Sequence, residues 1–158
     1  MANTAIWQVA LGTAPANWQP AFGTEINSLA SGAYTPGSII LDNTGGLLTD
    51  GTISVSLGSV APSASGANIA FFLQQLNQDL STYGDGIGAG TVIPVSGYIG
   101  SMTWPTSSTA AVLTQSLKLQ IEIPPTKFKL GVVNNLGSAL AASGNVISIA
   151  LNAINLNG

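Results

Sequence analysis

Cysteine, histidine and arginine are absent from this chain of 158 residues. Without cysteine and histidine, the chain can form no disulfide, no catalytic thiol, no histidine-based triad and no zinc site of the usual kind. Six Asp and Glu residues are the main acid–base groups left, and nothing marks which two would meet in a site. We therefore expect a protein that is not an enzyme and has no catalytic, cofactor-binding or metal-binding residues. A hydrolase built on carboxylates alone is the alternative.

Charge is also scarce, because charged residues make up 6% of the chain, whereas soluble domains average about 25%. The net charge is -3, and the only cations are three lysines. Binding to a nucleic-acid backbone needs clustered cations, so we expect no nucleic-acid partner. Because burying a charge in a contact is costly, a surface with so few charges indicates a protein partner or further copies of this chain. The alternative is a secreted or bacterial surface protein kept in solution by hydroxyl and amide groups.

Long apolar runs are missing although the mean hydropathy is +0.42. No stretch of about 20 apolar residues occurs, and Asn, Gly and Ser interrupt the longest charge-free segment, Leu130–Gly158. We therefore expect no membrane partner. The first short apolar run follows no Lys or Arg, so we also expect no secretory signal.

Turn-forming residues are plentiful and evenly spread, with 19 Gly and 8 Pro. This spacing leaves little room for long helices and predicts one all-β domain over residues 1–158, a sandwich or barrel. The clearest strand is 117–123, where Leu or Ile alternates with polar residues, and the alternation returns at 128–133. We predict a hairpin between these two runs, with Ile123 opposite Phe128 and Leu119 opposite Val132 inside, and Glu122 beside Lys129 outside.

Several other segments have the two-residue alternation of a half-buried strand. The clearest are 53–57 and 147–151, and shorter strands are predicted at 7–11 and 38–42. Pro94 and Gly97 interrupt the segment 92–102, so this strand should lie at an edge or contain a bulge.

The segment Asn68–Leu80 fits both helical spacing and alternation. The all-β surroundings favour a strand of about eight residues followed by a loop. The stretch Asn17–Ser31 has room for a short helical turn near Glu25.

Three groups of residues have a possible chemical role and a simpler structural one. Asp79 and Asp85, with Asn77, could bind Ca²⁺, but their spacing matches no EF-hand and they are ordinary turn residues, which is the favoured interpretation. The glycines of 84–90 and of 45–46 lack the Lys and Ser or Thr of a phosphate loop. The Trp residues could stack on a sugar, but packing is the favoured role of all three, Trp7, Trp18 and Trp104.

Three stretches together carry a resemblance to a known family: Trp18–Leu29, then Leu76–Asp79 with Tyr83–Gly86, and then Pro124–Asn145. They resemble small virion proteins of tailed bacteriophages, of the capsid decoration or cement type. The resemblance covers most of the chain and is weakest from Ile87 to Gln115. It implies an antiparallel β-sandwich of jelly-roll type, located on the virion, that binds the major capsid protein, and a homo-oligomer.

The final strand departs from this family, whose members end in a more polar, aromatic or basic strand than residues 147–158. A second hypothesis is a carbohydrate- or receptor-binding module of a phage tail or fibre. That hypothesis predicts an exposed aromatic ring beside polar loop groups, with Tyr83, Asp85 and Trp104 as the candidates.

Overall fold

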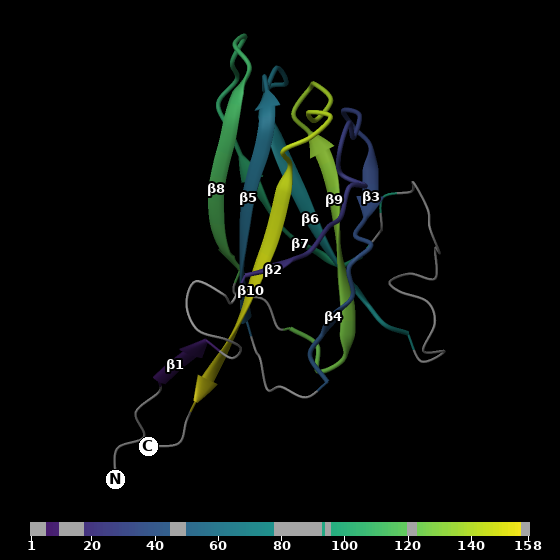
Figure 1. Ribbon diagram of the computed structural model, residues 1–158, viewed down its shortest axis with the longest axis vertical. Helices are drawn as coiled ribbons and strands as arrows, with labels where there is room; N and C mark the ends of the chain where they lie inside the picture. Colours follow the sequence, from purple (N-terminus) through teal and green to yellow (C-terminus); the bar gives the residue numbers. More distant parts are fainter. Residues whose placement is uncertain are drawn as a thin grey trace.

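The computed structural model describes residues 6–9, 18–44, 50–77, 93, 96–119 and 123–155. Within these residues the chain forms ten β-strands in two antiparallel sheets that face each other (Figure 1). The predicted all-β class and the sandwich architecture are therefore confirmed.

The first sheet, sheet A, contains both the first and the last strand of the chain. Its order is β1-β10-β5-β8, and β2 also pairs with β10. Its strands are β1 (Ile6–Val9), β2 (Gln19–Pro20), β5 (Asp50–Val60), β8 (Ala111–Leu119) and β10 (Val146–Asn155). The last strand therefore lies inside its sheet, between β5 on one side and the two N-terminal strands on the other.

The second sheet, sheet B, has the order β3-β9-β6-β7, and β4 also pairs with β9. Its strands are β3 (Tyr34–Pro36), β4 (Leu41–Asp42), β6 (Asn68–Gln75), β7 (Tyr98–Thr103) and β9 (Lys127–Asn135). Its centre is the pair β6 and β9, joined in register from Asn68 opposite Asn135 to Gln75 opposite Phe128.

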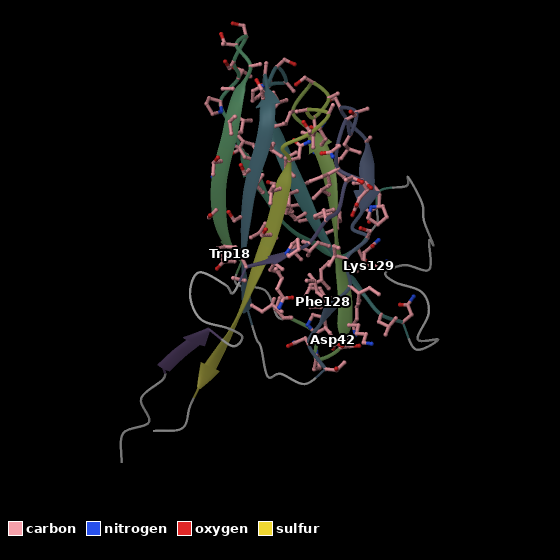
Figure 2. All side chains as sticks on the ribbon, viewed as in Figure 1. Trp18, Asp42, Phe128 and Lys129 are labelled. Atoms are coloured by element: carbon pink, nitrogen blue, oxygen red, sulfur yellow. The ribbon has the colours of Figure 1, made fainter. Side chains whose placement is uncertain are left out.

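The core lies between the sheets and is built from alternate residues of the long strands. Successive strand residues point to opposite faces, as Phe128, which is fully buried, and its neighbour Lys129, which is partly exposed, illustrate (Figure 2). Burying each large apolar side chain stabilises the fold by about 1.5–3 kcal/mol. The fully buried members include Ile53, Val55 and Leu57 of β5, Ile149 of β10, Phe71 of β6, and Phe128 and Leu130 of β9.

The predicted hairpin between 117–123 and 128–133 is wrong. Leu119 of β8 lies opposite Gly51 in sheet A, whereas Val132 of β9 lies opposite Phe71 in sheet B. The chain thus crosses from one sheet to the other between these two strands. Alternation identifies the buried face of a strand, and that face points into the same core from either sheet, so the pattern does not identify the neighbouring strand. Glu122 lies outside the described residues.

Most of the single-strand predictions are confirmed. The ambiguous segment contains an eight-residue strand, β6 (Asn68–Gln75). The strand predicted to lie at an edge or contain a bulge does both, because β7 ends sheet B and its pairing with β6 shifts register between Phe71 and Phe72. Strands β5 and β10 cover the runs 53–57 and 147–151, and β1 and β4 cover parts of the two short predicted strands.

Near Glu25 the chain forms hydrogen-bonded turns instead of the expected helical turn. The N–H of Asn27 donates to the carbonyl of Thr24, and the N–H of Leu29 donates to that of Ile26.

Candidate interaction surface

One end of the sandwich is held together by two buried asparagines. Asn134 is fully buried at the end of β9. Its Nδ2 donates to the carbonyl oxygens of Leu29 and Ser138, at 2.8 and 2.9 Å. Its Oδ1 accepts a hydrogen bond of 3.0 Å from the N–H of Leu136. The side chain therefore fastens the loop after β2 to the turn that follows β9.

Asn145, just before β10, connects three segments in the same way. Its Oδ1 accepts from the N–H of Gly58, where the β5–β8 pairing becomes irregular, at 3.1 Å. Its Nδ2 donates to Asn27 Oδ1 at 2.8 Å and to the carbonyl of Ala141 at 2.7 Å. Two stretches that carry the family resemblance, Trp18–Leu29 and Pro124–Asn145, thus meet here through hydrogen bonds. The structural role of both asparagines was not predicted, and their only signal in the sequence is an amide next to apolar strand residues.

A glycine allows a close approach of two connections at this end of the molecule. Gly137 has a φ of 86°, a left-handed conformation that strains any other residue. A Cβ at this position would also run into the backbone nitrogen of Ala64. The β9–β10 connection therefore lies directly against the β5–β6 turn.

The aromatic residues predicted for sugar binding do not form a common platform. Trp104 follows β7 and packs, half-buried, against the core. Trp18, with 40% of its side chain exposed, precedes β2 beside sheet A (Figure 2). The structure therefore places these two rings on different sheets. Several candidate residues lie outside what the structure describes. They are the side chain of Trp7, and Asp79, Tyr83, Asp85 and residues 84–90.

The described residues contain no group of three acidic side chains placed to hold a metal ion. They also contain no helix of the length and apolarity needed to cross a membrane. A shallow hollow of about 250 Å³ lies between two loops and is lined by Pro62, Ser63, Thr106, Ser107 and Ser108. Its lining is uncharged and mostly hydroxyl-bearing.

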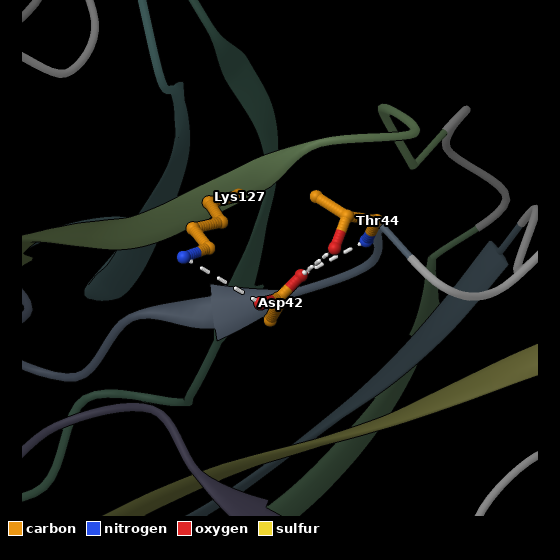
Figure 3. A network of polar contacts seen from close by, with 3 residues as sticks. All are labelled: Asp42, Thr44 and Lys127. Atoms are coloured by element: carbon orange, nitrogen blue, oxygen red, sulfur yellow. Dashed lines mark hydrogen bonds and ion pairs between the residues drawn. The ribbon is translucent and has the colours of Figure 1, made fainter. Parts of the chain in front are cut away.

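The clearest charged contact supports a turn. Asp42 Oδ1 accepts hydrogen bonds from the N–H and the hydroxyl of Thr44, at 2.9 and 2.6 Å, and Oδ2 lies 3.8 Å from Lys127 Nζ (Figure 3). The hydrogen bonds from Thr44, and then the nearby Lys127, lower the pKa of Asp42. This arrangement caps the end of β4 and joins it to β9. Lys127 of β9 therefore forms its ion pair with Asp42 of β4. The predicted hairpin did not place β4 beside β9.

The outer face of sheet B is filled largely by its own rings. Tyr34 lies over Gly131, where a side chain would clash with the ring. Its ring meets Phe72 edge-on with centroids 6.1 Å apart, and Phe72 meets Tyr98 at 5.7 Å. Tyr34 and Phe72 are buried, while Tyr98 is 59% exposed. Lys127 and Lys129, which lie on β9, add two of the three cations to this sheet.

The outer face of sheet A is different, and we call it the hydroxyl face. It consists of the outward residues of β5, β10 and β8 whose side chains the structure describes: Thr52, Ser54, Ser56, Val146, Ser148, Ala150, Val112, Thr114 and Ser116. None of these nine residues carries a charge.

Strand register arranges the hydroxyl face in rows. Ser148 lies opposite Ser54 on β5, and Ser54 in turn lies opposite Ser116 on β8. The hydroxyls of Ser54 and Ser116 are 3.3 Å apart. The outer face of an antiparallel sandwich normally carries charged and polar residues that keep it in water. A sheet face of short uncharged side chains instead resembles a surface that can be covered at little desolvation cost.

Comparisons with protein-family models, with characterised proteins and with solved structures find no match to this chain.

Proposed function

We propose that this protein is a structural component of a tailed-bacteriophage virion that binds the major capsid protein and reinforces the head. The observation that carries the proposal is the hydroxyl face, a broad sheet surface whose described side chains are all uncharged. The resemblance of three stretches to capsid decoration or cement proteins supplies the partner. In this proposal the protein is not an enzyme, acts without a cofactor, and works as a homo-oligomer on the capsid surface.

The proposed mechanism is mass action. A protein that binds only assembled capsid subunits stabilises the assembled lattice by its binding free energy. Contact with two neighbouring subunits at once strengthens this effect, because the second contact forms at a high effective concentration. The hydroxyl face offers a broad contact surface whose described side chains are uncharged, and Lys118 lies in register with Thr52 towards the end of β8. Burying an isolated charge in such a contact would cost several kcal/mol.

The test is binding of the purified protein to capsids that lack it, measured by co-sedimentation and located by electron microscopy. Ser148→Lys places a charge in the middle row of the hydroxyl face and should weaken capsid binding at least about tenfold, which is about 1.4 kcal/mol. The matched control is Ser101→Lys, a half-buried serine of β7 in sheet B, which should bind like the wild type.

Density for the chain at the tail, or equal binding by Ser148→Lys, would refute the proposal.

The alternative function is binding of a carbohydrate or receptor. It gains no support from Trp104, which packs against the core. Specific hits on a glycan array, combined with no affinity for capsids, would replace the capsid proposal with this one.

A further inference from the structure

The edges of the two sheets are protected to very different degrees. A free strand edge presents unpaired N–H and C=O groups, and proteins protect such edges with short strands, proline, bulges or charge. In sheet B, β3 and β4 have three and two residues and β3 ends in Pro36. On the other side of that sheet, β7 is irregular, with positive φ at Gly100 and at Gly97 just before the strand. In sheet A, β1 and β2 are also short, with four and two residues.

Strand β8 has fewer of these protections, because its charged residue, Lys118, and the register shift in its pairing with β5 both lie towards its ends. It spans nine residues, Ala111–Leu119, and among the described strands it pairs with β5 alone. Its first seven residues contain no charge, no proline and no glycine. Its register with β5 is unbroken from Leu57–Leu113 to Gly51–Leu119. Val112 is 66% exposed, and Thr114, Gln115 and Ser116 are exposed as well.

We infer that the free edge of β8 pairs antiparallel with β8 of a second copy of this chain, across a two-fold axis at Thr114. The two copies of sheet A then form one continuous sheet. In this register Val112 lies opposite Ser116 of the second copy on the outer face, and Leu113 lies opposite Gln115 on the inner face. Thr114 lies opposite its own copy, a Thr–Thr pair that is favourable across antiparallel strands.

A second copy fits this edge for reasons of charge and symmetry. Each copy has a net charge of -3, yet residues 111–117 carry none of it, so two edges meet without opposing like charges. Antiparallel pairing of identical strands uses the same patch on both partners, which is the requirement of a two-fold interface. Pairing also covers Leu113, which is only partly buried at the margin of the core.

This inference can be tested without capsids, so its failure would leave the proposed binding to the capsid protein untouched and would remove only the homo-oligomer from the proposed function. The protein should sediment at twice the 15.9 kDa of the chain. Thr114→Lys and Thr114→Glu each place like charges opposite each other, and each should weaken self-association at least about tenfold. An equimolar mixture of the two variants should associate again. Ser148→Lys, on the same face but in the interior of the sheet, should associate like the wild type.

A cross-link provides the second measurement, because the chain has no cysteine of its own. Residues that face each other in antiparallel strands have Cα atoms about 4.5–5.5 Å apart, within the range of a disulfide. Under mild oxidation, Thr114→Cys should give a covalent dimer at least about ten times faster than Thr103→Cys, an exposed position on β7. Unchanged circular dichroism spectra would confirm that each variant folds. A wild-type chain that stays monomeric, or equal cross-linking at both positions, would overturn the inference.

Discussion

Asn145 shows how one residue can determine the shape of a whole end of the molecule. Its amide makes three hydrogen bonds to segments that lie far apart in the sequence, near Asn27, Gly58 and Ala141. Buried polar groups stabilise a fold only when their partners are in place, and a lost partner leaves the others desolvated and unpaired. The amide therefore fixes the relative positions of two loops and the end of β5.

Replacing this amide should be costly. Asn145→Leu removes the acceptor for the buried N–H of Gly58 and both donated hydrogen bonds, and should lower the free energy of unfolding by about 3 kcal/mol. The midpoint temperature of thermal unfolding should fall by about 10 °C, since 1 kcal/mol corresponds to about 2–4 °C in a domain of this size. Asn68→Ala, at a partly exposed amide, is the control and should cost about 1 kcal/mol. Equal losses at the two positions would show that Asn145 has no special structural role.

Glu25 gives the fold a dependence on pH. Partial burial raises the pKa of this carboxyl, but hydrogen bonds from the backbone N–H of Ser38, of Glu25 itself and of Gly23, and from the Ser38 hydroxyl, outweigh it and lower the pKa below its usual 4.5. The bond from the N–H of Ser38 is 2.6 Å long. A lowered folded-state pKa means that the carboxylate stabilises the fold fully above the unfolded pKa. That stabilisation is lost as the pH falls through the lowered value.

Glu25→Gln removes the charged form, so the difference in unfolding free energy between the wild type and this variant measures its contribution. The wild type should be the more stable protein near pH 7, and its advantage should shrink as the pH falls below about 4.5. Urea unfolding of both proteins at several pH values measures this difference. An advantage that is constant from about pH 7 to about pH 2.5 would contradict the role assigned to the charged form.

At the scale of the element, strand β5 separates the core from the surface one residue at a time. Ile53, Val55 and Leu57 are fully buried, while Ser54 and Ser56 are partly exposed on the hydroxyl face. The alternation visible in the sequence predicted these faces correctly, because side-chain direction in a strand depends only on position along the chain. The partners of β5, which are β8 and β10, were not predicted.

Two neighbouring substitutions test the faces of β5. Val55→Asp buries an unpaired carboxylate in the core and should cost at least about 4 kcal/mol, enough to unfold or aggregate the protein. Ser54→Asp places the same carboxylate at the surface and should change the unfolding free energy by less than about 0.5 kcal/mol. Urea unfolding of the two variants measures the contrast. Comparable damage from both would mean that the buried and exposed faces are assigned wrongly.

At the scale of the whole molecule, sequence patterns predicted the all-β class and most of the strands. They predicted neither which strands pair nor the end of the sandwich that Asn134 and Asn145 hold together. Leu119 and Val132 have the same alternation, yet they lie in different sheets. The role of Asn134 depends on the carbonyl of Leu29, which lies 105 residues away in the sequence, so no local pattern contains it. The hydroxyl face was predictable only as a general shortage of charge, because its rows appear once β5, β8 and β10 are placed side by side. The jelly-roll connection stays a prediction.

The position of β10 inside sheet A affects how the chain reaches its fold. Because β10 separates β5 from β1 and β2, sheet A cannot close until the last strand has left the ribosome. Until then β5 has no neighbour on one side, and the N-terminal strands lack the partner against which they dock. Pairing β1 with β10 also joins residues that lie far apart in the sequence, from Ile6 opposite Asn155 to Val9 opposite Asn152, and such non-local contacts slow folding to milliseconds or seconds. Closure of sheet A therefore waits for the emergence of β10.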